Sequence, residues 1–303
     1  SIFITASNYA TTLSDTASVA NANIILGDTT GIVTAVVASD SAENLNTNLT
    51  NAITGNDALT LTVSGTSAVA SDLIGLDGKT SVNVKADGTV TTITGTAANI
   101  QTVVTAATID TAANVNVTVD SGTATVAQQI AIDAQTTGTI TATIAEGDVS
   151  SLKTLTASGG VHALTINISD TSASASDLNT IDSKTSVNVN AGSISLLTGT
   201  IAQVQAAYTA NTAGTITGLG DEAVTVTDVT LSSTDLNSLD LNTSGTITLS
   251  NATTINVANG ETLKLNNFTV SNSVTINDST GNEIITGTSG NDTINLTTGS
   301  DTV

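Results

Sequence analysis

"SDLIGLDGKTSVNV" (Ser71–Val84) and "SDLNTIDSKTSVNV" (Ser176–Val189) are two copies of one stretch, identical at ten of fourteen positions. A third copy, "TDLNSLDLNTSGTI", begins at Thr234, and two fainter copies begin at Asn23 and Gln129. The last apolar residue before the turn marks each copy. These markers are Leu26, Leu76, Ile132, Ile181 and Leu239, which lie 50, 56, 49 and 58 residues apart.

A second motif lies between the copies of the first. "TGTAANIQTVVTA" from Thr94 matches "TGTIAQVQAAYTA" from Thr198, and weaker relatives begin at Ser41 and Asp148. The predicted helix N-caps are Ser41, Thr96, Asp148 and Thr200, spaced 55, 52 and 52 residues apart. The unit therefore has about fifty residues and two similar halves, and such a fixed period is typical of a repeat protein.

Each half repeat is expected to contain a strand, a turn and a short helix. Runs such as "TINIS" and "SVNVN" alternate in the manner of strands. In the second motif, Ile201, Val204 and Tyr208 share one helical face, as do the three matching residues Ala97, Ile100 and Val104. Helices of barely two turns are unstable alone in water, so they must pack against the strands.

These patterns predict a mainly β protein with short helices. The expected fold is a parallel β-solenoid, or β-helix, in which each coil has about 26 residues. We expect residues 1–240 to hold the double-coil repeats, residues 241–277 to form shorter all-β coils, and residues 278–303 to form a separate C-terminal segment.

The composition excludes several classes of function. The 303 residues include 26 acidic residues, five lysines and no arginine, which gives a net charge of -21. Such a chain would repel nucleic acids and anionic membranes. No stretch reaches the ~20 apolar residues of a membrane-spanning helix. The chain has no Met and opens without a secretory signal, so we expect a processed product or part of a longer protein.

The C-terminal segment contains three units of about nine residues. "DSTGNEIIT", "GTSGNDTIN" and "LTTGSDTV" place an acid at Glu283, Asp292 and Asp301. Each acid follows a glycine two residues earlier, at Gly281, Gly290 and Gly299. Glycine permits the tight turn that aims carbonyl oxygens at a cation, and calcium prefers six to eight oxygen ligands. The alternative is that these Gly-Asn-Asp clusters are ordinary turns between short strands.

These nine-residue units resemble the haemolysin-type (RTX) calcium-binding repeat. The fifty-residue units, with "DLNTID" and "LTGTIAQVQAAY", resemble repeats of large secreted RTX surface proteins of cyanobacteria. The resemblance implies a terminal β-roll that binds Ca²⁺, with Glu283 and Asp301 on one edge and Asp292 on the other. It also implies a secreted protein, extracellular or at the cell surface. The segment departs from the family pattern at Glu283, where the family has Asp, and it has the first glycine of the repeat only at Gly287.

The expected function is structural rather than enzymatic. We expect a calcium-stabilised subunit of a surface layer, fibre or sheath that assembles with itself end to end, with cell-surface polysaccharide as a further partner. The alternatives are the stalk of a cell-surface adhesin, a polysaccharide-modifying enzyme, and ice binding by the "GTIT" threonines. The only histidine, His162, is expected to occupy an ordinary loop position. Acids recur after each helix and are expected to form turn hydrogen bonds rather than a row of ion sites: Asp77, Asp133, Asp182 and Asp240.

Overall fold

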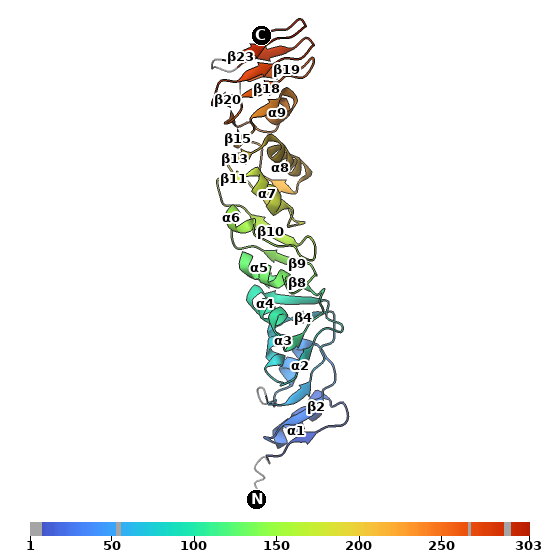
Figure 1. Cartoon of the computed structure of the whole chain (residues 1–303). Coiled ribbons are helices and arrows are strands. Elements are labelled where there is room, and N and C mark those ends of the chain that lie inside the picture. Colours follow the sequence, from blue (N-terminus) through green and yellow to red (C-terminus); the bar gives the residue numbers. More distant parts are fainter. Residues whose placement is uncertain (1–7, 53–55, 266–267, 288–291) are drawn as a thin grey trace, which may run out of the picture. The chain divides into compact units, whose positions relative to one another are not determined.

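The structure is a computed structural model that describes residues 8–52, 56–265, 268–287 and 292–303 (Figure 1). It divides into two compact units. The first comprises Ser1–Ala145 and Leu155–Leu164, and the second comprises Glu146–Thr154 and Thr165–Val303. The domain boundaries expected near residues 240 and 277 stay predictions.

The described helices are α1 (Val19–Asp28), α2 (Ala42–Asn48), α3 (Ala70–Asp77), α4 (Ala97–Thr105), α5 (Val126–Asp133), α6 (Val149–Leu152), α7 (Ala175–Asp182), α8 (Ile201–Ala213) and α9 (Ser233–Asp240). The described strands of the first half of the chain are β1 (Thr11–Thr12), β2 (Val33–Val36), β3 (Ala58–Thr60), β4 (Ser67–Val69), β5 (Val84–Lys85), β6 (Thr92–Thr96), β7 (Ile109–Asp110), β8 (Asn116–Ser121) and β9 (Ile140–Thr143). Those of the second half are β10 (Ala163–Asn167), β11 (Ser172–Ser174), β12 (Val189–Asn190), β13 (Leu196–Gly199), β14 (Ile216–Thr217), β15 (Ala223–Val226), β16 (Thr230–Ser232), β17 (Ile247–Leu249), β18 (Thr254–Asn256), β19 (Thr262–Lys264), β20 (Phe268–Val270), β21 (Thr275–Asn277), β22 (Ile284–Thr286) and β23 (Thr293–Asn295).

The helices begin where the repeat predicts. Ser41, Thr96, Asp148 and Thr200 are confirmed as N-caps, because each side chain accepts the backbone N–H of the residue three positions later. The apolar faces are confirmed too. Ile201, Val204 and Tyr208 of α8 are buried, and so are the matching residues of α4 and all five marker residues.

Strands pair in parallel with strands of the neighbouring repeat units. In the first unit, the sheet orders are β1-β2-β3, β4-β6-β8-β9 and β5-β7. In the second unit, they are β10-β12-β14, β11-β13-β15-β17-β20, β16-β18-β21-β23 and β19-β22. The helices α2 to α5 contact one another in succession within the first unit, as do α6 to α9 within the second (Figure 1).

The fold class is mixed α/β, and the expectation of a mainly β solenoid that ends in a β-roll was wrong. Helices take 26% of the residues and strands 30%, and the strands belong to several separate small parallel sheets. The described strands are two to six residues long, whereas most helices have eight residues or more. The helices therefore make up nearly as large a share of the fold as the strands. The tail strands β21–β23 join two of these small sheets in place of a β-roll.

A buried threonine recurs at the turn after the helix, three or four residues beyond each marker. It is Thr29, Thr80, Thr136, Thr185 or Thr243. The hydroxyls of Thr29, Thr80, Thr136 and Thr243 each donate to a carbonyl 20 or 21 residues earlier in the chain, at distances of 2.6–2.8 Å. All five accept the N–H of the residue two positions later. One side chain thus closes its own turn, and Thr29, Thr80, Thr136 and Thr243 also bond to a carbonyl in or just before a strand about half a repeat earlier.

Candidate metal centre

Three carboxylates gather near the C-terminal end of the described chain. Asp278, Glu283 and Asp301 each offer an oxygen atom, and these atoms all lie within 4.8 Å of one another. Backbone pairing brings them together. Ile284 forms a parallel bridge with Thr302, the Thr302 N–H donates to the Glu283 carbonyl at 2.9 Å, and the Ile285 N–H donates to the Thr302 carbonyl at 2.8 Å. This 18-residue register sets Asp301 beside Glu283.

Glu283 is the most enclosed member of this acidic cluster, with a side chain that has no exposed surface. Its Oε1 accepts the Gly260 N–H at 2.8 Å and the Ser279 hydroxyl at 2.9 Å. Its Oε2 is buried and has no hydrogen-bond partner among the described residues. A buried polar oxygen without a partner is rare in folded proteins because burial costs it the hydrogen bonds of water.

Asp278 and Asp301 are held by the backbone of the neighbouring turns. The Thr297 N–H donates to Asp278 Oδ2 at 3.0 Å, and this bond holds the pKa of Asp278 below its usual value. Asp278 Oδ1 is also buried and without a partner in the described part of the chain. The Glu283 N–H donates to Asp301 Oδ1 at 3.2 Å.

The acidic cluster suits a hard divalent cation. Its donors are all carboxylate oxygens, which calcium and magnesium prefer to nitrogen or sulfur. Three nearby carboxylates repel one another, and two of their buried oxygens lack a donor. A cation between them would remove the repulsion and supply the missing partner for both oxygens. The donor set therefore fits the calcium that the RTX resemblance implies.

Two of the predicted glycines stand where a side chain would collide with this site. A Cβ on Gly281 would meet the Glu283 carboxylate, and a Cβ on Gly299 would meet the Gly281 carbonyl oxygen. Gly290 lies outside the described residues. Asp292 does not belong to the acidic cluster, and a Cβ on Gly287 would lie 2.8 Å from Asp292 Oδ2.

Asp278 was missed by the sequence reasoning. It occupies the first position of "DSTGNEIIT", where the nine-residue pattern has glycine, and so it fell outside the predicted ligand set. The acid at a position where the pattern has glycine was the feature of the sequence that could have identified Asp278. Glu283 and Asp301 were predicted and lie together, whereas a metal-binding role for any of the three stays a prediction.

Two of the acids after the helices, Asp133 and Asp182, bond to later segments of the chain. Asp133 accepts the backbone N–H and the hydroxyl of Ser158, and Asp182 Oδ2 accepts the Thr215 hydroxyl at 3.0 Å. Burial raises the pKa of Asp182. These bonds agree with a structural role, although the partners lie 25 and 33 residues further along the chain.

His162 does not occupy an ordinary loop position. Its side chain is fully buried and its Nε2 lies 2.7 Å from Asp133 Oδ1, a contact between residues 29 positions apart. A catalytic role would need access to a substrate, which this burial denies. The only histidine of the chain therefore belongs to the interior.

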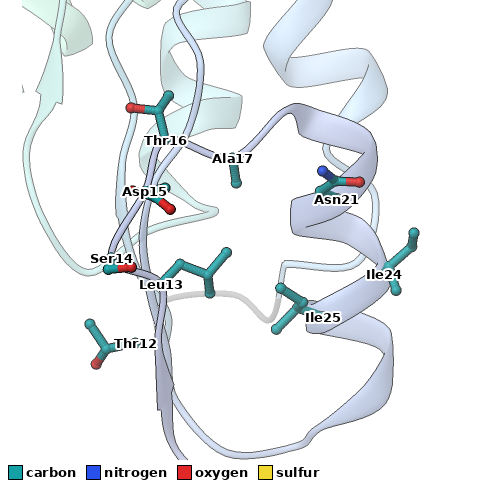
Figure 2. Close-up of a pocket in the computed structure, with 9 residues that line it drawn as sticks. All are labelled: Thr12, Leu13, Ser14, Asp15, Thr16, Ala17, Asn21, Ile24 and Ile25. Atoms are coloured by element: carbon teal, nitrogen blue, oxygen red, sulfur yellow. The ribbon is translucent and has the colours of Figure 1, made fainter.

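A cavity of about 460 Å³ lies beside α1 in the first unit (Figure 2). Residues 12–17 line one side, and Asn21, Ile24 and Ile25 of α1 line the other. Leu13 and Ile25 point toward one another across the opening in Figure 2. Asp15 is the single titratable side chain of this lining, so the cavity offers no pair of groups for acid–base or nucleophilic chemistry.

Searches against protein-family models, curated proteins and solved structures found no match to this chain. No helix in the described part of the chain is both long enough and apolar enough to cross a bilayer.

Proposed function

We propose that this chain is an extracellular structural protein whose acidic cluster binds calcium, and that copies of it associate in a surface layer, fibre or sheath. The observation that carries the proposal is the buried Glu283, whose Oε2 lacks a partner while two further carboxylates face it. Calcium is the bound ion in this proposal.

Charge and location favour calcium over a tighter transition-metal site. The chain contains no cysteine, and its single histidine lies far from the acidic cluster in the sequence. Carboxylate sites with few fixed ligands bind calcium weakly, with dissociation constants of about 10⁻⁴–10⁻³ M in extracellular modules. Such affinities require the high calcium concentration outside cells. A net charge of -21 also makes neutralisation by divalent cations a condition for close approach of two copies.

One sheet face supports self-association. The strands β18, β21 and β23 repeat the sequence Thr-Ile-Asn in register, so their threonines form one column and their asparagines another. The Asn277 amide donates to Asn256 at 3.2 Å, and the Asn295 amide donates to Asn277 at 2.9 Å. Uncharged, in-register columns of this kind pack face to face between chains in cross-β assemblies. On so acidic a chain, the Thr and Asn columns of this face add no charge of their own to the repulsion between two copies.

The test measures calcium binding and assembly on the same samples. Wild type is titrated with CaCl₂ by calorimetry and melted with calcium or with EDTA, alongside Glu283→Gln and Asp278→Asn. Asp221→Asn is the matched control, because it removes one exposed carboxylate of the same unit. At a hundred times the dissociation constant, bound calcium stabilises the folded state by about 2.7 kcal/mol.

We expect calcium to raise the melting temperature of wild type and of Asp221→Asn, and much less that of the two cluster variants. Sedimentation velocity should show larger species with calcium than with EDTA. An identical melting temperature in calcium and EDTA would remove the ion from the proposal. Monomers at every protein and calcium concentration would remove the assembly.

A further inference from the structure

The segment Leu155–Leu164 is fastened to the first unit by polar side chains of α5. It belongs to that unit, while Glu146–Thr154 before it and the chain from Thr165 onward belong to the second. Gln129 exchanges two hydrogen bonds with the Thr156 backbone, at 2.9 and 3.2 Å. Asp133, one helical turn later, binds Ser158 and His162. Both α5 side chains are buried.

We propose that the Asp133–His162 pair is an acid-sensitive clasp that holds residues 155–164 on the first unit at neutral pH and releases them in mild acid. The proposal rests on the hydrogen bonds around a buried ring, and it is independent of calcium binding and of assembly.

The hydrogen bonds fix the tautomer of His162. The Ile140 N–H donates to Nδ1 at 3.2 Å, so this nitrogen must carry a lone pair rather than a proton. The proton of the neutral ring therefore sits on Nε2 and is donated to Asp133 Oδ1 at 2.7 Å. The neutral imidazole satisfies both bonds, and it is the form that this geometry accepts.

Adding a proton to either member of the clasp would break one of its hydrogen bonds. On Nδ1 it would face the Ile140 N–H, so the ring would have to turn away from β9. On Asp133 it would compete with the donors already there, since Oδ2 accepts the Ser158 hydroxyl at 2.7 Å and the Ser158 N–H at 3.0 Å. Because the ring is fully buried, water cannot replace the lost partner without opening the segment.

The carboxylate of Asp133 is held in its charged form by the polar groups around it. Burial alone would raise the pKa of Asp133, but the polar groups of Thr156, Ser158 and His162 outweigh it and hold that pKa below its usual value. Asp133 therefore stays ionised in mild acid, in the range where histidine ordinarily titrates, near about 6.5. Asp133 is the charged group that faces the ring. The described hydrogen bonds also bring two neutral groups to the pair, the Ile140 N–H of β9 and Ser158 of the segment.

Hydrogen–deuterium exchange of the whole chain tests the clasp. Peptides covering residues 155–164 are compared at about pH 7.5 and about pH 5, after correction for intrinsic exchange, in wild type and in His162→Gln. Glutamine stays neutral at both pH values and keeps a donor for Asp133. We expect exchange in wild type to rise at least about tenfold in acid, and the variant to show no such rise. Peptides from α2 serve as the internal control, because α2 lies in the same unit and packs against α1 and α3.

Equal pH responses in wild type and His162→Gln would overturn the proposal, and so would an unchanged segment in wild type. A second readout covers the case in which the variant does not fold. The chain has a single histidine, so the NMR signals of its ring report on His162 alone. The ring should titrate together with the rise in segment exchange, and a ring that stays neutral down to about pH 4 would refute the clasp.

Discussion

Replacing Thr136 with valine removes one hydroxyl from the interior and leaves the shape of the side chain nearly unchanged. Thr136 is 3% exposed. Its hydroxyl donates to the Val115 carbonyl at 2.6 Å and accepts the Gly138 N–H at 2.9 Å. The variant Thr136→Val leaves both backbone groups without this partner.

The expected decrease in the free energy of unfolding follows from the tight packing at this turn. A buried donor or acceptor that loses its partner costs about 1–3 kcal/mol, so two such groups cost about 2–6 kcal/mol in the free energy of unfolding. Water cannot repair the loss, because a Cβ added to Gly138 would already collide with the Val115 carbonyl. We therefore expect Thr136→Val to fall in this range.

Urea denaturation followed by far-ultraviolet circular dichroism measures the effect, since the chain has no tryptophan. Thr141→Val is the matched control, because Thr141 is exposed on the neighbouring strand β9. The control should change the free energy of unfolding by less than about 0.5 kcal/mol. Equal stability of the two variants would show that the buried threonine does not fasten the repeats.

Three further perturbations have outcomes set by the structure. Gly214→Ala should cost about 1–2 kcal/mol in the free energy of unfolding, because Gly214 ends α8 with φ of 82° and open space around it; a neutral result in denaturation would contradict the left-handed cap. Burial, and then the hydrogen bond to Glu222, raise the pKa of Tyr208, so wild type should lose stability as pH rises above about 10. Tyr208→Phe should lose less over that range, and parallel pH profiles of the two melting temperatures would refute this. Lys153→Met should cost less than about 0.5 kcal/mol, because the 3.1 Å pair with Asp177 is partly exposed, and added salt should remove the difference.

The repeat spacing predicted local structure well and the fold class poorly. Caps such as Thr200 and buried residues such as Ile181 follow from hydrogen-bonding and apolar periodicity within one repeat, and the structure confirms both. The fold class depends on how far strand pairing extends between repeats. Strands as short as β5 and β7 end where a turn or helix intervenes, and these two form a sheet of two strands. Nothing in the alternation of a single strand indicates where its sheet will end.

The polar contacts were the least predictable part of the molecule. His162 meets Asp133 across 29 residues, and Glu283 meets Asp301 across 18. The second pair was predicted because the nine-residue pattern repeats there. The first was missed because no second histidine marks the position. A threonine three or four residues after each marker signalled the buried position, but its hydroxyl bonds become evident only once the earlier strand is placed beside it.

The short distance along the sequence between each buried threonine and its hydrogen-bond partner limits how the chain can gain or lose residues. The hydroxyls of Thr29, Thr80, Thr136 and Thr243 donate to carbonyls only 20 or 21 residues earlier, so these bonds join neighbouring parts of the chain. A gene duplication that inserts one whole fifty-residue unit would carry its own fastening with it and leave the others intact. An insertion of half that size at the same place would leave one strand without its threonine. Natural variants of this chain should therefore differ by complete units.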